Sequence, residues 1–237
     1  LKEVRLNPIK PEQVNSWEIG YRGVFARKLY VDINAYFNRY FNFIGDLRFY
    51  MPDNKDIVVG TESAEDAMLT GAYNLIQMPT NAQQKVDAYG ASVGLNYYIW
   101  KSLVGMFNYT YSGINTKNLV DPIIPGFNTP NHKFNLGISA QRIWKGLGFG
   151  VNFKWVSKYN WESTFGDGVV PSYHMLDMQV SYEFPRWFTL QVGGSNIYNN
   201  RHIEAYGSPK IGALVYGSMV FDLERKGNDT ERWLKKK

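Results

Sequence analysis

The sequence predicts an all-β protein, an antiparallel transmembrane β-barrel. Three observations lead to this fold class. Apolar and polar residues alternate along most of the chain, and the alternating segments are unusually long. The connections between these segments alternate between short turns and long loops. Alternation with a period of two means that one face of each strand meets an apolar medium and the other face a polar one.

The alternation is clearest in residues 29–43. One parity holds Leu29, Val31, Ile33, Ala35, Phe37, Phe41 and Phe43, and the other holds Tyr30, Asp32, Asn34, Tyr36, Asn38, Tyr40 and Asn42. Strands of soluble sandwiches are usually about 5 to 6 residues long. A tilted strand needs about 9 to 11 residues to cross the hydrocarbon core of a membrane. The length of this run therefore fits a membrane crossing.

Interruptions of the alternating pattern divide the chain into about nine such strands. They cover residues 12–25, 28–44, 84–99, 103–113, 131–143, 147–158, 172–184, 187–197 and 212–223. Short turns fall at Ala26-Arg27, Lys101-Ser102, Lys145-Gly146 and Pro185-Arg186, and long loops at 45–83, 114–130, 159–171 and 198–211. Membrane barrels have short periplasmic turns and longer extracellular loops, whereas a soluble sandwich has no reason to sort its loops by length.

Each short turn carries a basic residue beside aromatic residues, as in Trp100-Lys101 and Trp144-Lys145. Aromatic rings favour the headgroup region of a membrane, where Lys and Arg can reach lipid phosphates. We interpret the four turns as part of a periplasmic girdle. The alternative is ordinary turn polarity beside core aromatic residues.

The same parity holds in the other strands, and it separates two faces. The expected lipid face includes Trp17, Ile19, Tyr21, Tyr89, Val93, Phe107, Tyr109, Phe134, Leu136, Phe153, Trp155, Leu176 and Val180. The opposite face includes Glu18, Arg22, Ser92, Asn96, Asn108, Thr110, Asn135, Asn152, Lys154, Asp177 and Gln179. A dry core could not satisfy so many polar groups, so this face must be wet or filled by a polar plug. Arg39 interrupts the lipid row, at a height where we expect the outer interface.

Composition excludes several classes of protein. The 237 residues, 16% of them aromatic, are too apolar for a disordered chain. No apolar run is long enough for a transmembrane helix, and no cysteine exists to form disulfides or thiolate metal sites. The net charge is +5, of which +3 lies in the tail from Glu224 to Lys237, so the body gives no nucleic-acid signal. The chain begins at Leu1 without a signal segment, which predicts a fragment.

Several segments resemble one family, the TonB-dependent outer-membrane receptors of the siderophore-receptor or SusC-like type. The segments are residues 11–23 (PEQVNSWEIGYRG), 28–36 (KLYVDINAY), 127–135 (FNTPNHKFN), 193–200 (GGSNIYNN) and 205–212 (AYGSPKIG). The resemblance spans about residues 11–223 and is specific to the family but not to a substrate. It departs from the family at the end, because Phe221-Asp222-Leu223 is followed by a charged tail where such barrels finish on an aromatic residue.

The resemblance implies the C-terminal part of a barrel of about 22 strands, with the family's N-terminal plug domain absent from this chain. We expect residues 1–223 to form this partial barrel and residues 224–237 to be a charged tail. Upstream strands would close the barrel, because open strand edges are not tolerated in lipid. The implied partners are outer-membrane lipids, the TonB complex through an N-terminal region, the plug and a surface lipoprotein, with no nucleic acid.

No catalytic residue, cofactor site or metal site is predicted. His132, His174 and His202 lack a ligand spacing, and no G-x-S-x-G nucleophile motif occurs. Acidic residues in the loop 45–83 match no calcium motif and are interpreted as a solvated face. Within that loop, Asp56 to Gly60 and Ala72 to Met78 look extended, which predicts a protruding hairpin.

Candidate ligand-binding residues lie in two outer loops, which mix aromatic rings with charged and amide groups. They are Asn160, Trp161, Glu162, Arg201, His202 and Tyr206. Such groups can stack on and hydrogen-bond a ligand, although aromatic residues at a barrel rim also serve as a membrane girdle.

We therefore expect a multi-pass protein of the outer membrane that binds and imports a scarce nutrient, such as a metal chelate, oligosaccharide, peptide or cofactor, and that is not an enzyme. The first alternative is a passive outer-membrane porin or channel. The second is an outer-membrane adhesion or assembly barrel that uses its long loops as a platform.

Overall fold

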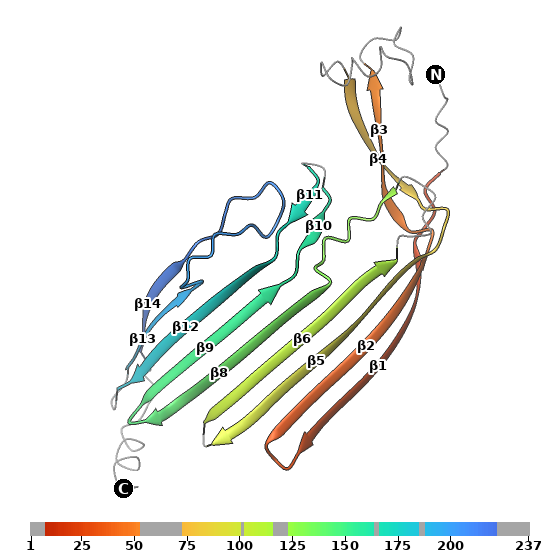
Figure 1. Ribbon diagram of the computed structural model, residues 1–237. Helices are drawn as coiled ribbons and strands as arrows, with labels where there is room; N and C mark the ends of the chain where they lie inside the picture. The colour runs from red at the N-terminus through yellow and green to blue at the C-terminus, as the bar shows by residue number, and fades with distance from the viewer. Residues whose placement is uncertain are drawn as a thin grey trace.

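The computed structural model describes residues 8–52, 73–100, 102–115, 123–163, 166–184 and 188–221. Nine strands form one antiparallel sheet in which each strand pairs with its neighbours in chain order (Figure 1). They are β1 (Gln13–Phe25), β2 (Leu29–Phe41), β5 (Val86–Trp100), β6 (Leu103–Asn115), β8 (His132–Trp144), β9 (Leu147–Val156), β12 (Tyr173–Glu183), β13 (Phe188–Ser195) and β14 (Leu214–Phe221).

The nine predicted strands are confirmed, with ends that differ by a few residues. Their short connections lie along one end of the sheet and the longer connections along the other (Figure 1). At the first short turn, Ala26 and Arg27 both have positive φ, of 48° and 56°. Such a backbone matches the twist of a tight hairpin. The charged tail 224–237 lies outside the described residues.

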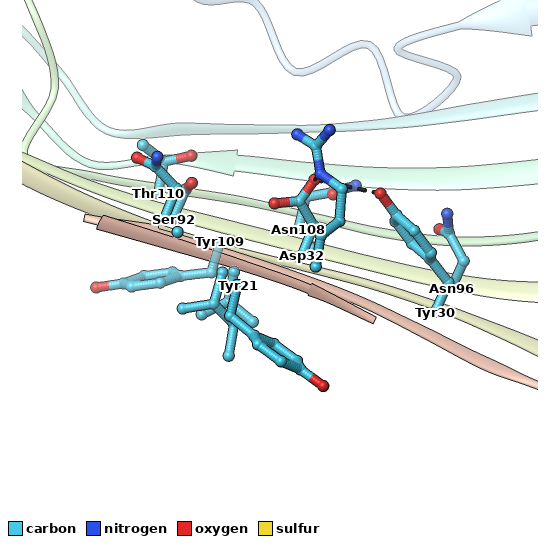
Figure 2. Close-up of a pocket in the computed structure, with 14 residues that line it drawn as sticks. Tyr21, Tyr30, Asp32, Ser92, Asn96, Asn108, Tyr109 and Thr110 are labelled. Atoms are coloured by element: carbon cyan, nitrogen blue, oxygen red, sulfur yellow. Dashed lines mark hydrogen bonds and ion pairs between the residues drawn. The ribbon is translucent and has the colours of Figure 1, made fainter. Parts of the chain in front are cut away.

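Strand register places the polar residues of neighbouring strands on one face. One row of directly paired positions runs through Arg22, Asp32, Gly94, Asn108, Asn135 and Lys154. The next row, on the opposite face, runs through Tyr21, Ile33, Val93, Tyr109, Phe134 and Trp155. Figure 2 shows Asp32, Asn96 and Asn108 on one side of the sheet and Tyr21 and Tyr109 on the other.

The apolar face of this sheet is uncovered by protein. Trp17, Ile19 and Leu136 remain 54%, 77% and 55% exposed. Each Å² of apolar surface removed from water contributes roughly 25 cal/mol, so an uncovered face of this size needs an apolar medium against it. A hydrocarbon layer meets that need, and it accepts strands whose backbone groups are paired with those of their neighbours. No helix among the described residues is long and apolar enough to cross a membrane.

A band of ring contacts crosses the apolar face on the half nearer the long loops. Tyr111 contacts His132 with ring centroids 5.1 Å apart, and Phe134 stacks on Trp155 at 5.6 Å. The hydroxyl of Tyr109 lies 2.8 Å from Nδ1 of His132. Aromatic rings with a polar edge suit the boundary between hydrocarbon and headgroups. This band is the outer counterpart of the girdle that the sequence predicts at the turns.

The long connections contain additional short strands. β3 (Ile44–Pro52) and β4 (Tyr73–Asn81) form a hairpin that projects beyond the main sheet, and β7 (Ile123–Ile124) pairs with β3 (Figure 1). The predicted protruding hairpin is present, and its strand β4 includes residues 73–78 of the segment that the sequence predicts to be extended. The partner of β4 is β3, and Asp56 to Gly60 lie outside the described residues.

The predicted strand 28–44 is also corrected, because it ends at Phe41. Asn42 adopts a positive φ of 51°, which breaks the extended backbone before β3 starts at Ile44. Near the break, Tyr40, Phe43 and Ile114 pack against a small buried cluster of Ala82 and Val86. Hydrophobic alternation continues across the break, so the pattern alone could not locate it.

Arg39, the one charge in the predicted lipid row, is paired within the sheet. Its Nε and Nη2 donate to the two carboxylate oxygens of Asp87 at 2.8 and 2.9 Å. Asp87 is the direct cross-strand partner of Arg39 in β5. A bidentate pair satisfies both charges at the outer edge of the apolar face, which explains why an arginine is tolerated there.

Gly90 tests the packing of the polar face. A Cβ at this buried position would lie 2.6 Å from the Tyr111 carbonyl oxygen and 2.6 Å from the Tyr36 ring. At Gly150, the nearest atom to an added Cβ lies 3.9 Å away. We predict that Gly90→Ala destabilises the folded protein by about 1–3 kcal/mol, whereas Gly150→Ala has little effect. The temperature at which the folded protein loses its native electrophoretic mobility measures this difference. Equal mobility losses in the two variants would contradict the packing.

Candidate functional site in the outer loops and polar wall

Two outer connections that are distant in sequence meet beside the end of the sheet. β10 (Tyr159–Trp161) pairs with β11 (Gly168–Val170), and the last connection, residues 196–213, lies beside this hairpin (Figure 1). The ring of Tyr206 covers Gly168, where a Cβ would lie 2.1 Å from Tyr206 Cε2. Only glycine allows the ring to lie so close to the hairpin backbone.

Glu204 is the centre of the contact between the two connections. The Tyr159 hydroxyl donates to the Glu204 backbone carbonyl at 2.7 Å, and the Tyr173 hydroxyl donates to Glu204 Oε1 at 3.1 Å. Lys154 Nζ lies 3.5 Å from the same carboxylate oxygen. Burial, with the charge of Glu204, raises the pKa of Tyr159, so its hydroxyl stays protonated and continues to donate.

His202 fills the space beneath this contact. It is buried, and its ring stacks on Tyr173 with centroids 4.2 Å apart and planes 13° from parallel. Nδ1 lies 2.7 Å from the Asn200 carbonyl oxygen, so this nitrogen carries a proton and donates. Nε2 lies 3.7 Å from Glu204 Oε1, within reach of an ion pair when the ring is protonated.

The start of the last connection is fixed by hydrogen bonds around the buried Asn196. Asp177 Oδ1 accepts from Ser195 Oγ at 2.7 Å and from the Asn196 amide nitrogen at 2.9 Å. The Asn196 side chain then exchanges two hydrogen bonds of 3.0 Å with the backbone of Asn200. Because these bonds replace the strand ladder, the chain leaves β13 in a fixed direction toward the β10–β11 hairpin.

Glu162 joins a third connection to the same hairpin. Its Oε2 accepts from the Gly126 amide at 2.9 Å. The Asn128 side chain bonds both the backbone nitrogen and the carbonyl oxygen of Glu162, at 2.7 and 2.8 Å. The three connections that follow β6, β9 and β13 are therefore tied into one assembly at this part of the rim.

The structure divides the six candidate ligand residues into two groups. Glu162 accepts a hydrogen bond from the Gly126 amide, and the buried ring of His202 stacks on Tyr173 and hydrogen-bonds within its own connection, so both residues support the loops. Asn160, Arg201 and Tyr206 are exposed and Trp161 is partly exposed, so these four remain available to a ligand. Tyr159 and Tyr173 were missed by sequence reasoning because 45 and 31 residues separate them from Glu204. Among the described residues, no three His, Asp or Glu side chains gather closely enough to hold a metal ion.

A second candidate site lies on the polar wall. A hollow of about 650 Å³ opens between β1, β2, β5 and β6 (Figure 2). Arg22 and Asp32 form an ion pair of 2.8 Å on its edge. Gly20, Gly94, Ser92, Asn108 and Thr110 also line it. The hollow offers hydroxyl and amide groups, and no nucleophile with an adjacent general base is among its lining residues.

Sequence and structure comparisons agree with this architecture. The family model "TonB dependent receptor-like, beta-barrel" matches residues 3–197. The structure is similar to the "Copper transporter OprC", with a TM-score of 0.67 and 14% identity over 91% of this chain and 32% of that one. It is also similar to the siderophore receptor PirA from Acinetobacter baumannii, with a TM-score of 0.60 and 16% identity over 90% of this chain and 32% of the other.

A third similar structure is the ferric-catecholate import receptor Fiu from E. coli K12. Its TM-score is 0.56, with 16% identity over 90% of this chain and 28% of that one. The chain thus spans about a third of the length of these structures, and at such identities the likeness concerns the fold. No curated protein matches the sequence.

The contacts of Glu204 lead to a prediction for the last outer connection. Glu204→Ala removes the acceptor of Tyr173 and the partner of Lys154, so we expect the connection to open more often and trypsin to cleave after exposed Arg201 about tenfold faster. Glu204→Gln keeps an acceptor for Tyr173 and should fall between the variant with alanine and the parent. Limited proteolysis of the folded full-length receptor, followed by mass spectrometry, measures the rates. Unchanged cleavage in Glu204→Ala would show that the carboxylate does not hold the connection.

Proposed function

Because the chain belongs to the TonB-dependent receptor β-barrel family, we propose that residues 1–223 form part of the wall of an outer-membrane receptor that actively imports a scarce nutrient. Members of this family are outer-membrane receptors and not enzymes. Binding and gating are thus the chemistry required of this wall, and no covalent bond is made or broken.

One observation carries the proposal, namely the separation of the nine-stranded sheet into an apolar face and a polar face with elaborated connections at one end. The apolar face suits acyl chains. The polar face suits a hydrated interior through which a solute can pass. The tied connections at the outer end provide a platform for ligand capture.

In the proposed cycle, the outer connections and a plug domain first capture the nutrient. Asn160, Trp161, Arg201 and Tyr206 supply aromatic, amide and cationic groups for this contact, while Glu204 holds their two connections together. TonB, acting through an N-terminal region of the receptor, then draws on the plug and opens a path along the polar wall. The proposed partners are therefore TonB, the plug, further barrel strands, lipids and a surface lipoprotein.

The cargo classes proposed here are metal chelates, oligosaccharides, peptides and cofactors. The titles of the similar structures name copper and ferric-catecholate transport, which supports a metal complex as one member of this set. The outer connections select among these classes because they present the exposed groups that a ligand first meets.

Energised uptake tests the proposal. Cells that carry or lack the full-length receptor are given radiolabelled ferric catecholate, copper(II) or maltotriose. We predict receptor-dependent accumulation of one of these probes, which falls to the level of the deletion strain when a protonophore collapses the proton gradient. Accumulation that survives the collapse would contradict the proposal and support a passive channel. Failure of all three probes to accumulate would exclude the cargo classes that they represent.

Tyr206 provides a sharper variant for the same assay. We expect Tyr206→Ala to raise the probe concentration at half-maximal uptake by about tenfold. The reason is that the contact of an aromatic ring with a ligand contributes about 1.4 kcal/mol. Tyr198→Ala, at another exposed tyrosine of the same connection, is the matched control. Equal uptake curves for Tyr206→Ala and the control would remove Tyr206 from the proposed ligand contact.

A further inference from the structure

The polar wall carries almost no net charge. Among the described residues of the membrane-spanning strands, its acids are Glu18, Asp32 and Asp177, and its bases are Arg22, Lys133 and Lys154. At the turn end, Arg142 and Glu183 form a further ion pair. Equal numbers of the two signs leave this face without a net charge, so it has no overall preference for a cation or an anion.

Neutral hydrogen-bonding groups remain free on the same face. In β1 and β2 the amides are already engaged, since Asn34 donates to Glu18 at 2.6 Å and Asn38 accepts from Ser16 at 2.6 Å. In β5, β6, β8 and β9 the corresponding side chains make no hydrogen bond to other described residues. These free side chains are Ser92, Asn96, Asn108, Thr110, Asn135 and Asn152; we refer to them as the amide stripe.

Register makes the amide stripe continuous. Ser92 is the direct cross-strand partner of Thr110, and Asn108 that of Asn135. Gly94, next to Asn108, and Gly137, next to Asn152, bring no side chain into the stripe. An added Cβ at Gly94 would lie 3.1 Å from Asn108 Oδ1, so the glycine keeps this amide accessible. The stripe therefore presents donors and acceptors together with open backbone.

The hollow gives the stripe a defined binding volume. Ser92, Asn96, Asn108 and Thr110 all line it, together with Arg22 and Asp32, and Figure 2 shows Asp32 and Asn108 on the same side of the sheet. Its volume of about 650 Å³ is in the range of pockets that bind small molecules, roughly 300–1,000 Å³. A surface that binds a protein domain would instead be expected to be flat and extended over a larger area.

We propose that the hollow and the amide stripe form a transit site for an uncharged solute rich in hydroxyl or amide groups. The inference rests on the proposed transport function and narrows its cargo to a neutral oligosaccharide or a neutral peptide. A solute of this class satisfies the free amides one after another as it moves along the wall. A bare metal ion or a strongly charged chelate gains nothing from a wall whose charges cancel.

Thiol protection in the full-length receptor tests the transit site. The chain contains no cysteine, so Asn108→Cys places a single thiol of this region in the hollow once any cysteine elsewhere in the receptor is replaced. Asn38→Cys, on the same face but outside the hollow, is the matched control. Thr110→Cys is the second variant in case Asn108→Cys does not fold. A small uncharged maleimide is added to energised cells in the presence of maltotriose, acetyl-triglycine amide, tricarballylate or spermidine.

We expect maltotriose or acetyl-triglycine amide to slow alkylation at position 108 by about threefold, as a site occupied two-thirds of the time requires. The two neutral probes separate a sugar from a peptide cargo. Tricarballylate and spermidine should not protect, and the rate at position 38 should not change with any probe. Stronger protection by either charged probe, or free alkylation that no probe slows, would overturn the transit site.

Two further outcomes distinguish the transit site from permanent contact with the plug and from the proposal of energised opening. A thiol at position 108 that stays unreactive in energised cells would assign the stripe to permanent contact with the plug and overturn the transit site. Protection by a neutral probe that is unchanged after collapse of the proton gradient would support the transit site and contradict energised opening.

Discussion

The backbone hydrogen bonds of the sheet impose the constraint on which the rest of the structure depends. In hydrocarbon, every unpaired N–H or C=O costs several kcal/mol, so strands can cross a membrane only when both edges of each strand are paired. The seven inner strands of the main sheet meet this condition, whereas β1 and β14 each have one sheet neighbour among the described residues. Further strands must pair with these two edges in a membrane, as in a closed receptor barrel.

Pairing of this kind converts a linear pattern into two continuous surfaces. Because cross-strand partners share a face, most rows of the sheet are predominantly apolar or predominantly polar. Exceptions occur where the medium changes. The Arg39–Asp87 pair and the contacts of His132 lie on the apolar face toward the long connections, where headgroups can meet them. The polar face also carries apolar side chains, such as Met106 opposite Asn96, and water can satisfy its polar groups.

Most of the fold could be predicted from the sequence because it follows from local periodicity. Most of the candidate site could not, because it depends on contacts between segments that are distant in sequence. Nine strands, their two faces and the projecting hairpin follow from period-two alternation and from turn residues. The break at Asn42 does not, because a single left-handed residue leaves the hydrophobic pattern intact. Likewise, Trp161 and Tyr206 could be proposed from their side-chain chemistry. The Glu204 contacts with Tyr159 and Tyr173 required the tertiary arrangement of two separate connections.

The measurement that most directly tests the two-faced wall is the environment of successive residues along one strand. Nitroxide labels placed one at a time from Leu29 to Phe37 of β2, in the full-length receptor reconstituted in lipid, report their accessibility to oxygen and to a water-soluble nickel complex. A membrane wall predicts high oxygen accessibility at odd-numbered positions and high nickel accessibility at even-numbered ones. Equal exposure of both parities to the nickel complex, or an accessibility without a period of two, would contradict it.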